Sequence, residues 1–295
     1  MRVFVTGATG FIGSRIVPEL IGAGHQVLGL ARSDAGAQFL AAAGADVHRG
    51  DLEDLECLRS GSAASDAVLH VAFRHDWTRF AENCELDKRA IEAIGTVLRG
   101  SSRPFIVTSG VGVAQGRAAT EDDPPIPPSA TYPRASEATA VALMERSVHA
   151  SVMRLPQVHD TLKQGLVTPL IAIARARGVS AYVGDGLNRW PAAHVTDVAR
   201  LYRSALEKGT AGARYHAVAE EGVPLKDIAT VIGRGLNVPV ISIPPEKAQE
   251  HFGFLGFFAG RDAYVSSAQT RAKLGWNPTG PDLLTDLRNM HYMQA

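Results

Sequence analysis

Residues 6–13 read T-G-A-T-G-F-I-G, and the setting of this stretch decides the fold. The preceding residues 2–6, R-V-F-V-T, form a β-branched and aromatic run that predicts a strand. From position 11 to 21 apolar residues recur at helical spacing, which predicts a helix. The glycines therefore lie at a turn from a strand into a helix, where a phosphate-binding turn is expected.

Each glycine of this turn has its own physical role. Gly7 permits a sharp turn, Gly10 lets the backbone approach a pyrophosphate with no Cβ in between, and Gly13 lets the helix lie close to the sheet. The unpaired N–H groups at the start of the helix would then bind the anion. We therefore predict that a dinucleotide cofactor binds here.

The composition is that of a globular protein with no preference for polyanions. The chain has 295 residues, of which 45% are hydrophobic and 20% charged, and its formal net charge is +0. This balance argues against nucleic acid or an acidic membrane surface as a partner. No apolar run reaches the ~18 residues of a membrane span, and the first strand directly follows Met1, so we expect a cytoplasmic protein. Cys57 and Cys84, the only cysteines, are expected to be packing thiols, and no metal site is indicated.

The first 155 residues alternate between strand and helix patterns. Predicted strands lie near 2–6, 26–31, 46–48, 67–72, 104–108 and 151–155. This alternation is typical of the α/β class, with a doubly wound parallel sheet covered by helices on both faces.

The second half of the chain has a looser pattern. Helical periods lie near 161–177, 195–208, 224–236, 268–274 and 281–291. They predict a smaller C-terminal substrate-binding lobe within residues 156–295, with a segment of about 193–206 returning to the large domain. The proline-rich stretch 121–128 predicts a surface loop between a strand and the next helix.

Six stretches, in this order, resemble the short-chain dehydrogenase/reductase superfamily in its extended or atypical branch, the NAD-dependent epimerase/dehydratase-like enzymes. They are T-G-A-T-G-F-I-G at 6–13, G-D-L-E-D at 50–54, V-L-H-V-A-F at 68–73, F-I-V-T-S-G at 105–110, M-R-L-P-Q-V-H-D at 153–160 and H-V-T-D-V-A-R at 194–200. The resemblance covers nearly the whole chain. It implies a Rossmann fold that binds NAD(P) within residues 1–155.

The resemblance also implies which residues form the site. Cofactor contacts are expected from Thr6, Gly7, Thr9, Gly10, Phe11, Ile12, Gly13, Asp51, Leu52, Val71, Ala72, Phe73, Thr108, Leu155 and Pro156. Ser109 would hydrogen-bond a substrate carbonyl, and Val158 and His159 would face the substrate. We expect Trp190 to line the same cleft, whereas His194 and Asp197 are expected to hold the lobe against the sheet.

The catalytic helix departs from the superfamily pattern. Relatives place Tyr and Lys four residues apart, so that the ammonium lowers the pKa of the phenol that gives a proton to the carbonyl. Here residues 131–139 read T-Y-P-R-A-S-E-A-T, and the lysine is missing. Either Tyr132 takes the tyrosine position and Ser136 replaces the lysine, or Ser136 and Glu137 match the Ser-Lys pair and Pro133 replaces the tyrosine.

Three residues are therefore the catalytic candidates. Ser109 would hold the carbonyl, and Tyr132, or a water held by Ser109 and Arg134, would supply the proton. Arg134 would stabilise an oxyanion or contact the ribose. In the alternative interpretation Arg134 only pairs with Glu137 at i,i+3.

The end of the second predicted strand, V-L-G-L-A-R-S at 27–33, bears on cofactor choice. Enzymes that prefer NAD place an acidic residue there, but this chain has Arg32 and Ser33, which can bind a 2′-phosphate. Asp34 is interpreted as the N-cap of the next helix. We predict NADP (NADPH) as the cofactor, with NAD as the alternative.

The sequence as a whole predicts an NADPH-dependent carbonyl reductase acting on small or aromatic ketones. A sugar-nucleotide epimerase or dehydratase, and an NADP-sensing binding protein without turnover, stay open as alternatives. The phenylalanine-rich stretch H-F-G-F-L-G-F-F at 251–258 would cover a substrate or pack against a partner subunit, so a homodimer is compatible with the sequence.

Overall fold

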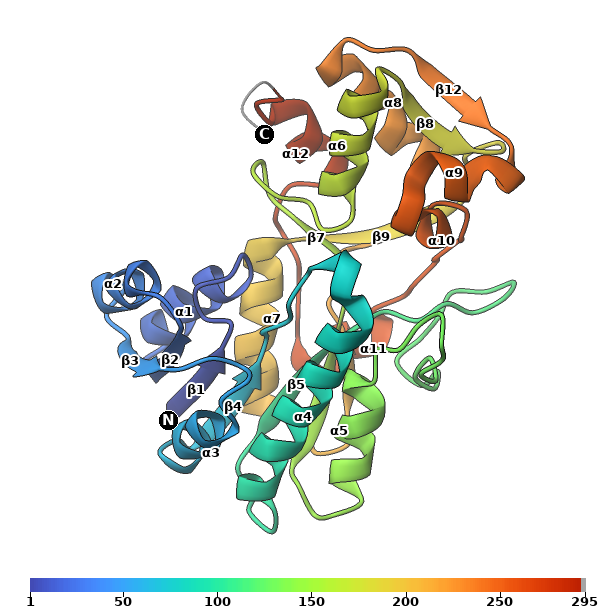
Figure 1. Cartoon of the computed structure of the whole chain (residues 1–295). Coiled ribbons are helices and arrows are strands. Elements are labelled where there is room, and N and C mark those ends of the chain that lie inside the picture. Colours follow the sequence, from blue (N-terminus) through green and yellow to red (C-terminus); the bar gives the residue numbers. More distant parts are fainter. Residues whose placement is uncertain (293–295) are drawn as a thin grey trace.

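The computed structural model describes residues 1–292, and its largest element is a seven-stranded parallel sheet (Figure 1). The strands are β1 (Arg2–Thr6), β2 (Gln26–Ala31), β3 (Asp46–Arg49), β4 (Ala67–His70), β5 (Phe105–Gly110), β6 (Ala150–Leu155) and β10 (Arg214–His216). Their order is β10-β6-β5-β4-β1-β2-β3, and all neighbouring strands are parallel. The order reverses between β1 and β4, which is where open α/β sheets bind their ligands.

Helices cover both faces of this sheet, as its apolar strands require. In β1, Val3 and Val5 pack into one core, and Phe4 points to the other, because successive side chains alternate across a strand. The first core contains residues of α1 (Gly13–Gly22), α2 (Asp34–Ala42), α7 (Val195–Lys208) and α11 (Ala268–Leu274). The second contains residues of α3 (Leu55–Ala63), α4 (Phe80–Leu98) and α5 (Ser136–Met144). In Figure 1 α4 and α5 lie side by side.

A smaller lobe, at the top of Figure 1, has its own apolar core. It consists of α6 (Val167–Arg177), β8 (Ser180–Val183), α8 (Leu225–Leu236), β12 (Val240–Ile243), α9 (Ala248–Phe252), α10 (Gly256–Ala259), α12 (Leu283–Asn289) and two 3-10 turns, η2 (Pro245–Lys247) and η3 (Gly253–Leu255). The strands β7 (Gln157–His159), β9 (Arg189–His194) and β11 (Glu220–Pro224) form a three-stranded sheet, and β7 and β9 run between the lobes (Figure 1). A third 3-10 turn, η1 (Trp77–Arg79), precedes α4.

The predicted fold class is confirmed, and the differences are local. The helix expected from 161 begins at Val167. Ser33 caps α2 by accepting the Gly36 N–H at 3.1 Å, so the assignment of Asp34 as the cap was wrong. The loop at 121–128 connects β5 to α5, but it is not wholly on the surface, because Glu121 is buried and accepts hydrogen bonds from Thr270. None of the helices within residues 1–292 is long and apolar enough to cross a membrane.

Candidate active site

The glycine turn between β1 and α1 is held by its own backbone. The Gly10 N–H donates to the Gly7 carbonyl at 2.9 Å. Gly7 has a φ of +70°, and a Cβ there would lie 2.7 Å from the backbone nitrogen of Ala72. A Cβ on Gly13 would lie 2.0 Å from the Gly7 carbonyl oxygen, whereas one on Gly10 would come no closer than 3.1 Å to it. The fold itself requires Gly7 and Gly13, and the open side of Gly10 fits a turn that faces a pyrophosphate.

The other predicted cofactor residues differ in burial. Half-buried positions that leave atoms accessible are Phe11, Ile12, Val71, Ala72, Phe73, Leu155 and Pro156, and Thr9 is exposed. Leu52 is buried. The Thr6 hydroxyl forms a hydrogen bond with the His70 ring at 2.9 Å. The Thr108 hydroxyl donates to the His70 carbonyl at 2.6 Å. The positions of these two side chains therefore do not support a direct cofactor contact.

Arg32 is exposed directly after the end of β2. No carboxylate in residues 1–292 pairs with it, whereas the neighbouring Asp34 is neutralised by Arg49. The Ser33 hydroxyl accepts a backbone hydrogen bond as the cap of α2 and keeps its proton for another acceptor. Asp51, predicted to flank the adenine, forms an ion pair with Arg74 at 2.7 Å.

The three catalytic candidates share one pocket at the carboxyl edge of β5. The residues that line it are Ser109, Gly110, Gly112, Pro124, Pro125, Ile126, Tyr132, Arg134, Glu137, Ala138 and Arg154. Tyr132 is half-buried, and its hydroxyl would lie 3.9 Å from a Cβ placed on Gly110. The phenol therefore reaches the end of β5, where Ser109 lies, although Tyr132 precedes the first residue of α5.

Arg134 is held from three directions. Its Nε donates to the Ser136 hydroxyl at 3.0 Å, and its Nη2 lies 3.4 Å from the Thr108 carbonyl. The guanidinium lies over the ring of Phe73, 4.4 Å from the ring centre. Within residues 1–292 it forms no ion pair with a carboxylate, so its charge is available to a ligand in the pocket.

The alternative pairing of Arg134 with Glu137 is wrong. Glu137 is buried and accepts two hydrogen bonds from Arg154, at 2.9 and 2.7 Å, and a third from Arg214 at 2.8 Å. Arg154 also donates to the Asp123 carbonyl at 2.7 Å, which fixes the proline-rich loop beside the pocket. Sequence spacing could not reveal this ion pair, because α5, β6 and β10 come together only in the folded sheet.

The predicted substrate-facing residues lie deeper than expected. The His159 ring is 0% exposed and its Nδ1 donates to Asp286 at 2.7 Å, so it joins β7 to α12 and does not face an open pocket. Burial lowers the pKa of the His159 imidazole, and Asp286 opposes that shift. Val158 is buried in the core of the large domain, and Trp190 is buried in that of the smaller lobe.

The predicted structural role of Asp197 agrees with its contacts. Its carboxylate accepts the N–H groups of Thr279 at 3.0 Å and Gly280 at 2.8 Å. These bonds fix the segment after α11 to the start of α7. His194 lies at the N-terminus of the same helix and accepts the Thr196 N–H.

The phenylalanine-rich segment of the smaller lobe contacts the pocket residue Tyr132. Phe254 stacks on Trp77 with ring centres 4.8 Å apart, and Phe257 stacks on Tyr132 at 6.4 Å. Phe254 and Phe257 are still 39% and 38% exposed. The segment therefore provides apolar surface next to the catalytic candidates, as covering a substrate would require.

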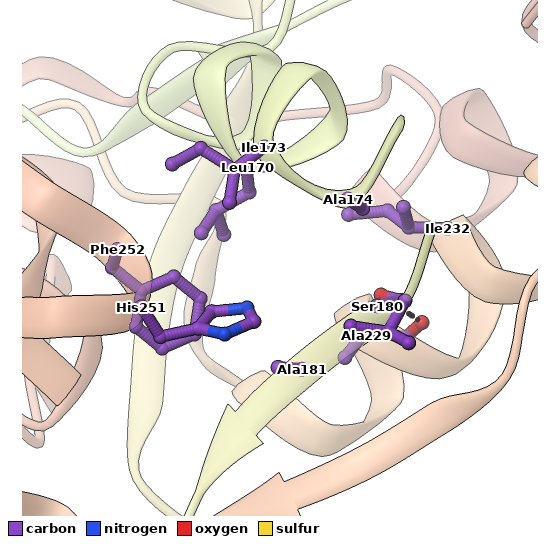
Figure 2. A pocket seen from close by; sticks show the side chains of 10 residues that line it. Leu170, Ile173, Ala174, Ser180, Ala181, Ala229, Ile232, His251 and Phe252 are labelled. Atoms are coloured by element: carbon purple, nitrogen blue, oxygen red, sulfur yellow. Dashed lines mark hydrogen bonds between the residues drawn. The ribbon is translucent and has the colours of Figure 1, made fainter. Parts of the chain in front are cut away.

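A second cavity lies inside the smaller lobe, away from these residues. Figure 2 shows Leu170 and Ile173 of α6 on one side, Ser180 of β8 on the other, and the His251 imidazole directed into the space between them. The Ser180 hydroxyl bonds to the Ala229 carbonyl. Apart from Ser180 and His251 its lining side chains are apolar, and none of the three catalytic candidates lines it.

Cys57 and Cys84 are buried free thiols, as expected, and burial raises the pKa of Cys84 to about 11. The part of the chain that the structure describes contains no group of three or more His, Cys, Asp or Glu side chains placed to hold a metal ion.

Residues 3–219 match the sequence profile of the NAD dependent epimerase/dehydratase family. The chain belongs to this family. The predicted resemblance is thus confirmed, and membership of the epimerase/dehydratase family supports an enzymatic role.

The names of individual relatives leave the specific activity of this family member undefined. An uncharacterized protein of Schizosaccharomyces pombe is 50% identical over 99% of the chain and 100% of its own length. A 4-hydroxy-2-methyl-3-oxo-4-farnesyl-3,4-dihydroquinoline-1-oxide ketoreductase of Stigmatella aurantiaca is 28% identical over 86% of the chain and 80% of its own. The UDP-glucose 4-epimerase of Thermus thermophilus, solved in complex with NAD, superposes with a TM-score of 0.76 at 20% identity over 100% of both chains, which supports the fold.

Sequence reasoning missed several residues around the site. His70 and Asp87 lie beneath the pocket, and Arg74 holds Asp51. One signal was present for Asp87: it lies on the apolar stripe of α4 with Cys84 and Ile91, and a charged residue on a buried stripe is exceptional.

Proposed function

We propose that this protein is an NADPH-dependent carbonyl reductase that reduces a ketone or aldehyde to an alcohol by hydride transfer. The observation that carries the proposal is the convergence of Ser109, Tyr132 and Arg134 on one pocket at the carboxyl edge of β5, in the same parallel sheet whose first strand leads into the glycine turn. A bound nicotinamide cofactor would supply the hydride. The protein has to hold the carbonyl, stabilise negative charge on its oxygen and supply a proton.

Each of these tasks has a candidate side chain. The Ser109 hydroxyl would donate to the carbonyl oxygen, and the Arg134 guanidinium would stabilise the developing alkoxide. Tyr132 would give the proton, with a water held by Ser109 and Arg134 as the alternative donor. Stacking of Phe257 on Tyr132 keeps apolar surface against the pocket, which favours an aromatic or otherwise apolar carbonyl substrate. The ketoreductase of Stigmatella aurantiaca, whose name describes a 3-oxo group on a farnesylated dihydroquinoline, is consistent with this choice.

The direct test is to incubate the purified protein with NADPH or NADH and a panel of aryl and alkyl ketones, following absorbance of the reduced nicotinamide. Loss of absorbance that depends on the ketone supports the reductase. Conversion of a nucleotide sugar with no net cofactor change would favour the epimerase, and tight NADPH binding without turnover would favour a cofactor sensor. From the sequence alone we also propose that the protein is cytoplasmic and forms a homodimer.

The pH dependence of the two reaction directions should differ. Burial raises the pKa of the Tyr132 phenol above its ordinary value of about 10, and Arg134 opposes this shift. A phenol with a raised pKa stays protonated at neutral pH, which suits a proton donor in reduction. We expect kcat for ketone reduction to stay level from about pH 6 to 9, and kcat for alcohol oxidation to rise about tenfold per pH unit, since oxidation needs the phenolate. A reduction rate that falls near pH 7 would assign the proton to another group.

Cofactor preference should depend on Arg32. Losing its contact with a 2′-phosphate should cost about 1.5–3 kcal/mol, the scale of hydrogen bonds to charged groups. We therefore expect Arg32→Ala to weaken NADPH binding roughly 10–150-fold and to leave NADH binding nearly unchanged. Titration of both cofactors into wild type and variant measures this, with Arg59→Ala, an arginine of α3 paired with Glu56, as the control. Equal losses for both cofactors would refute the preference.

A further inference from the structure

A buried chain of hydrogen bonds runs beneath the proposed active site and ends on Arg134. The Thr6 hydroxyl and the His70 Nδ1 are 2.9 Å apart, and the His70 Nε2 lies 3.1 Å from one oxygen of Asp87. The other Asp87 oxygen accepts the Ser136 hydroxyl at 2.6 Å, and Ser136 in turn accepts the Arg134 Nε–H at 3.0 Å. The chain thus connects β1, β4 and α4 to the start of α5.

One arrangement of protons, with His70 as the Nε2–H tautomer, satisfies every bond in this network. Arg134 can only donate, so the Ser136 oxygen accepts from it and directs its single proton to Asp87. Asp87, as a carboxylate, also accepts the Nε2–H of His70, which leaves Nδ1 to accept from Thr6. The Thr6 oxygen then accepts the Ala72 N–H at 3.4 Å. In this arrangement each proton has one acceptor, and the network holds its last member, Arg134, in one place.

The charges of Asp87 and Arg134 indicate what this hydrogen-bond network does. Asp87 is 2% exposed, and His70 and Ser136 are each 1% exposed. A carboxylate buried this deeply is costly unless a cation compensates it. No lysine or arginine in residues 1–292 forms an ion pair with Asp87, and the guanidinium on the far side of the Ser136 hydroxyl belongs to Arg134. Arg134 is thus linked to the Asp87 carboxylate through one hydroxyl, while His70 contacts the other carboxylate oxygen.

We propose that Asp87 is a positioning residue which, through Ser136, holds the Arg134 guanidinium at the reacting carbonyl. Ser136 fixes Nε, Phe73 supports one face, and Nη2 lies near the Thr108 carbonyl. Nη1 forms no hydrogen bond within residues 1–292, so it is the donor left for the substrate oxygen. The inference rests on the proposed function, since it gives Arg134 a defined geometry in carbonyl reduction.

Four variants test the positioning role. Asp87→Asn keeps the shape and removes the charge, and Ser136→Ala removes the bridge. Ser136→Thr restores a hydroxyl and should recover activity lost in Ser136→Ala. Thr139→Ala is the matched control, because its hydroxyl, on the same helix, bonds within residues 1–292 only to the Ala135 carbonyl.

Asp87→Asn and Ser136→Ala are each expected to lower kcat about 10–100-fold, as a small displacement of a catalytic group does, with KM and NADPH affinity nearly unchanged. In an Arg134→Ala background neither substitution should lower kcat further, because the group that they position is gone. Thr139→Ala should keep kcat near that of wild type. Unchanged kcat in folded Asp87→Asn and Ser136→Ala, or losses that multiply with that of Arg134→Ala, would overturn the inference. If Asp87→Asn does not fold, Ser136→Ala decides alone.

A second readout does not need turnover. The Arg134 Nε–H donates inside the protein, so its NMR signal should exchange slowly with solvent in wild type and become fast in Asp87→Asn and Ser136→Ala. If wild type reduces no ketone, the proposed function fails, and this signal still decides the positioning. A slow Arg134 signal in both variants would refute it.

Discussion

Tyr132→Phe is expected to lower the turnover of ketone reduction by roughly 10²–10⁴-fold, the usual scale of a general acid. The phenol lines the pocket with Ser109 and reaches toward Gly110, and Phe would keep its ring stacked on Phe257 while removing only the hydroxyl that gives the proton. NADPH affinity and thermal stability should change little. Measured kcat for the variant and for Tyr182→Phe, a tyrosine of β8 in the smaller lobe, would separate a catalytic hydroxyl from a general effect.

Ser109→Ala should cause a loss of the same order, because the serine would hold the carbonyl that Tyr132 protonates. Its control is Ser151→Ala, a buried serine on the neighbouring strand β6 that does not line the pocket. Full activity in Tyr132→Phe combined with loss in Arg134→Ala would instead assign the proton to a water held by Ser109 and Arg134. That result would contradict the assignment of Tyr132 as the proton donor, but it would still agree with the proposed carbonyl reductase activity.

The large domain could be predicted from sequence because its signals are local. The strand at 2–6, the glycine turn and the helix that follows lie within about twenty residues, and each has a pattern fixed by backbone geometry. The second half gave weaker signals. Gln157–His159 is too short to show a strand period, and its place in the three-stranded sheet depends on pairing with Ala192–His194.

Contacts between distant segments explain what sequence reasoning missed in the site. His159 was expected to face a substrate, but it is paired with Asp286, 127 residues further along the chain. Glu137 had a plausible partner in Arg134 three residues away, yet Arg154 of the adjacent strand binds it with better geometry. In both cases the partner that fixes the side chain belongs to another element of the fold, which local spacing does not reveal.

Gly10→Val is expected to abolish measurable NADPH binding while leaving the fold largely intact. Gly10 does not have a positive φ, and the nearest atom to an added Cβ is the Gly7 carbonyl oxygen at 3.1 Å, so the protein itself can accept a side chain with a small shift. On the open side of the turn, the branched side chain would occupy the space that the pyrophosphate needs and would hold it away from the N–H groups of α1.

Two glycines of the same region provide the controls. Gly22→Val, at the last residue of α1, adds a Cβ with nothing within 4 Å and should bind NADPH normally. Gly13→Val should instead lose the fold, because its Cβ would lie 2.0 Å from the Gly7 carbonyl oxygen, and that atom is backbone. NADPH titration and circular dichroism melting of all three variants distinguish loss of binding from loss of structure. Normal NADPH affinity in a folded Gly10→Val protein would show that the turn does not bind the phosphates.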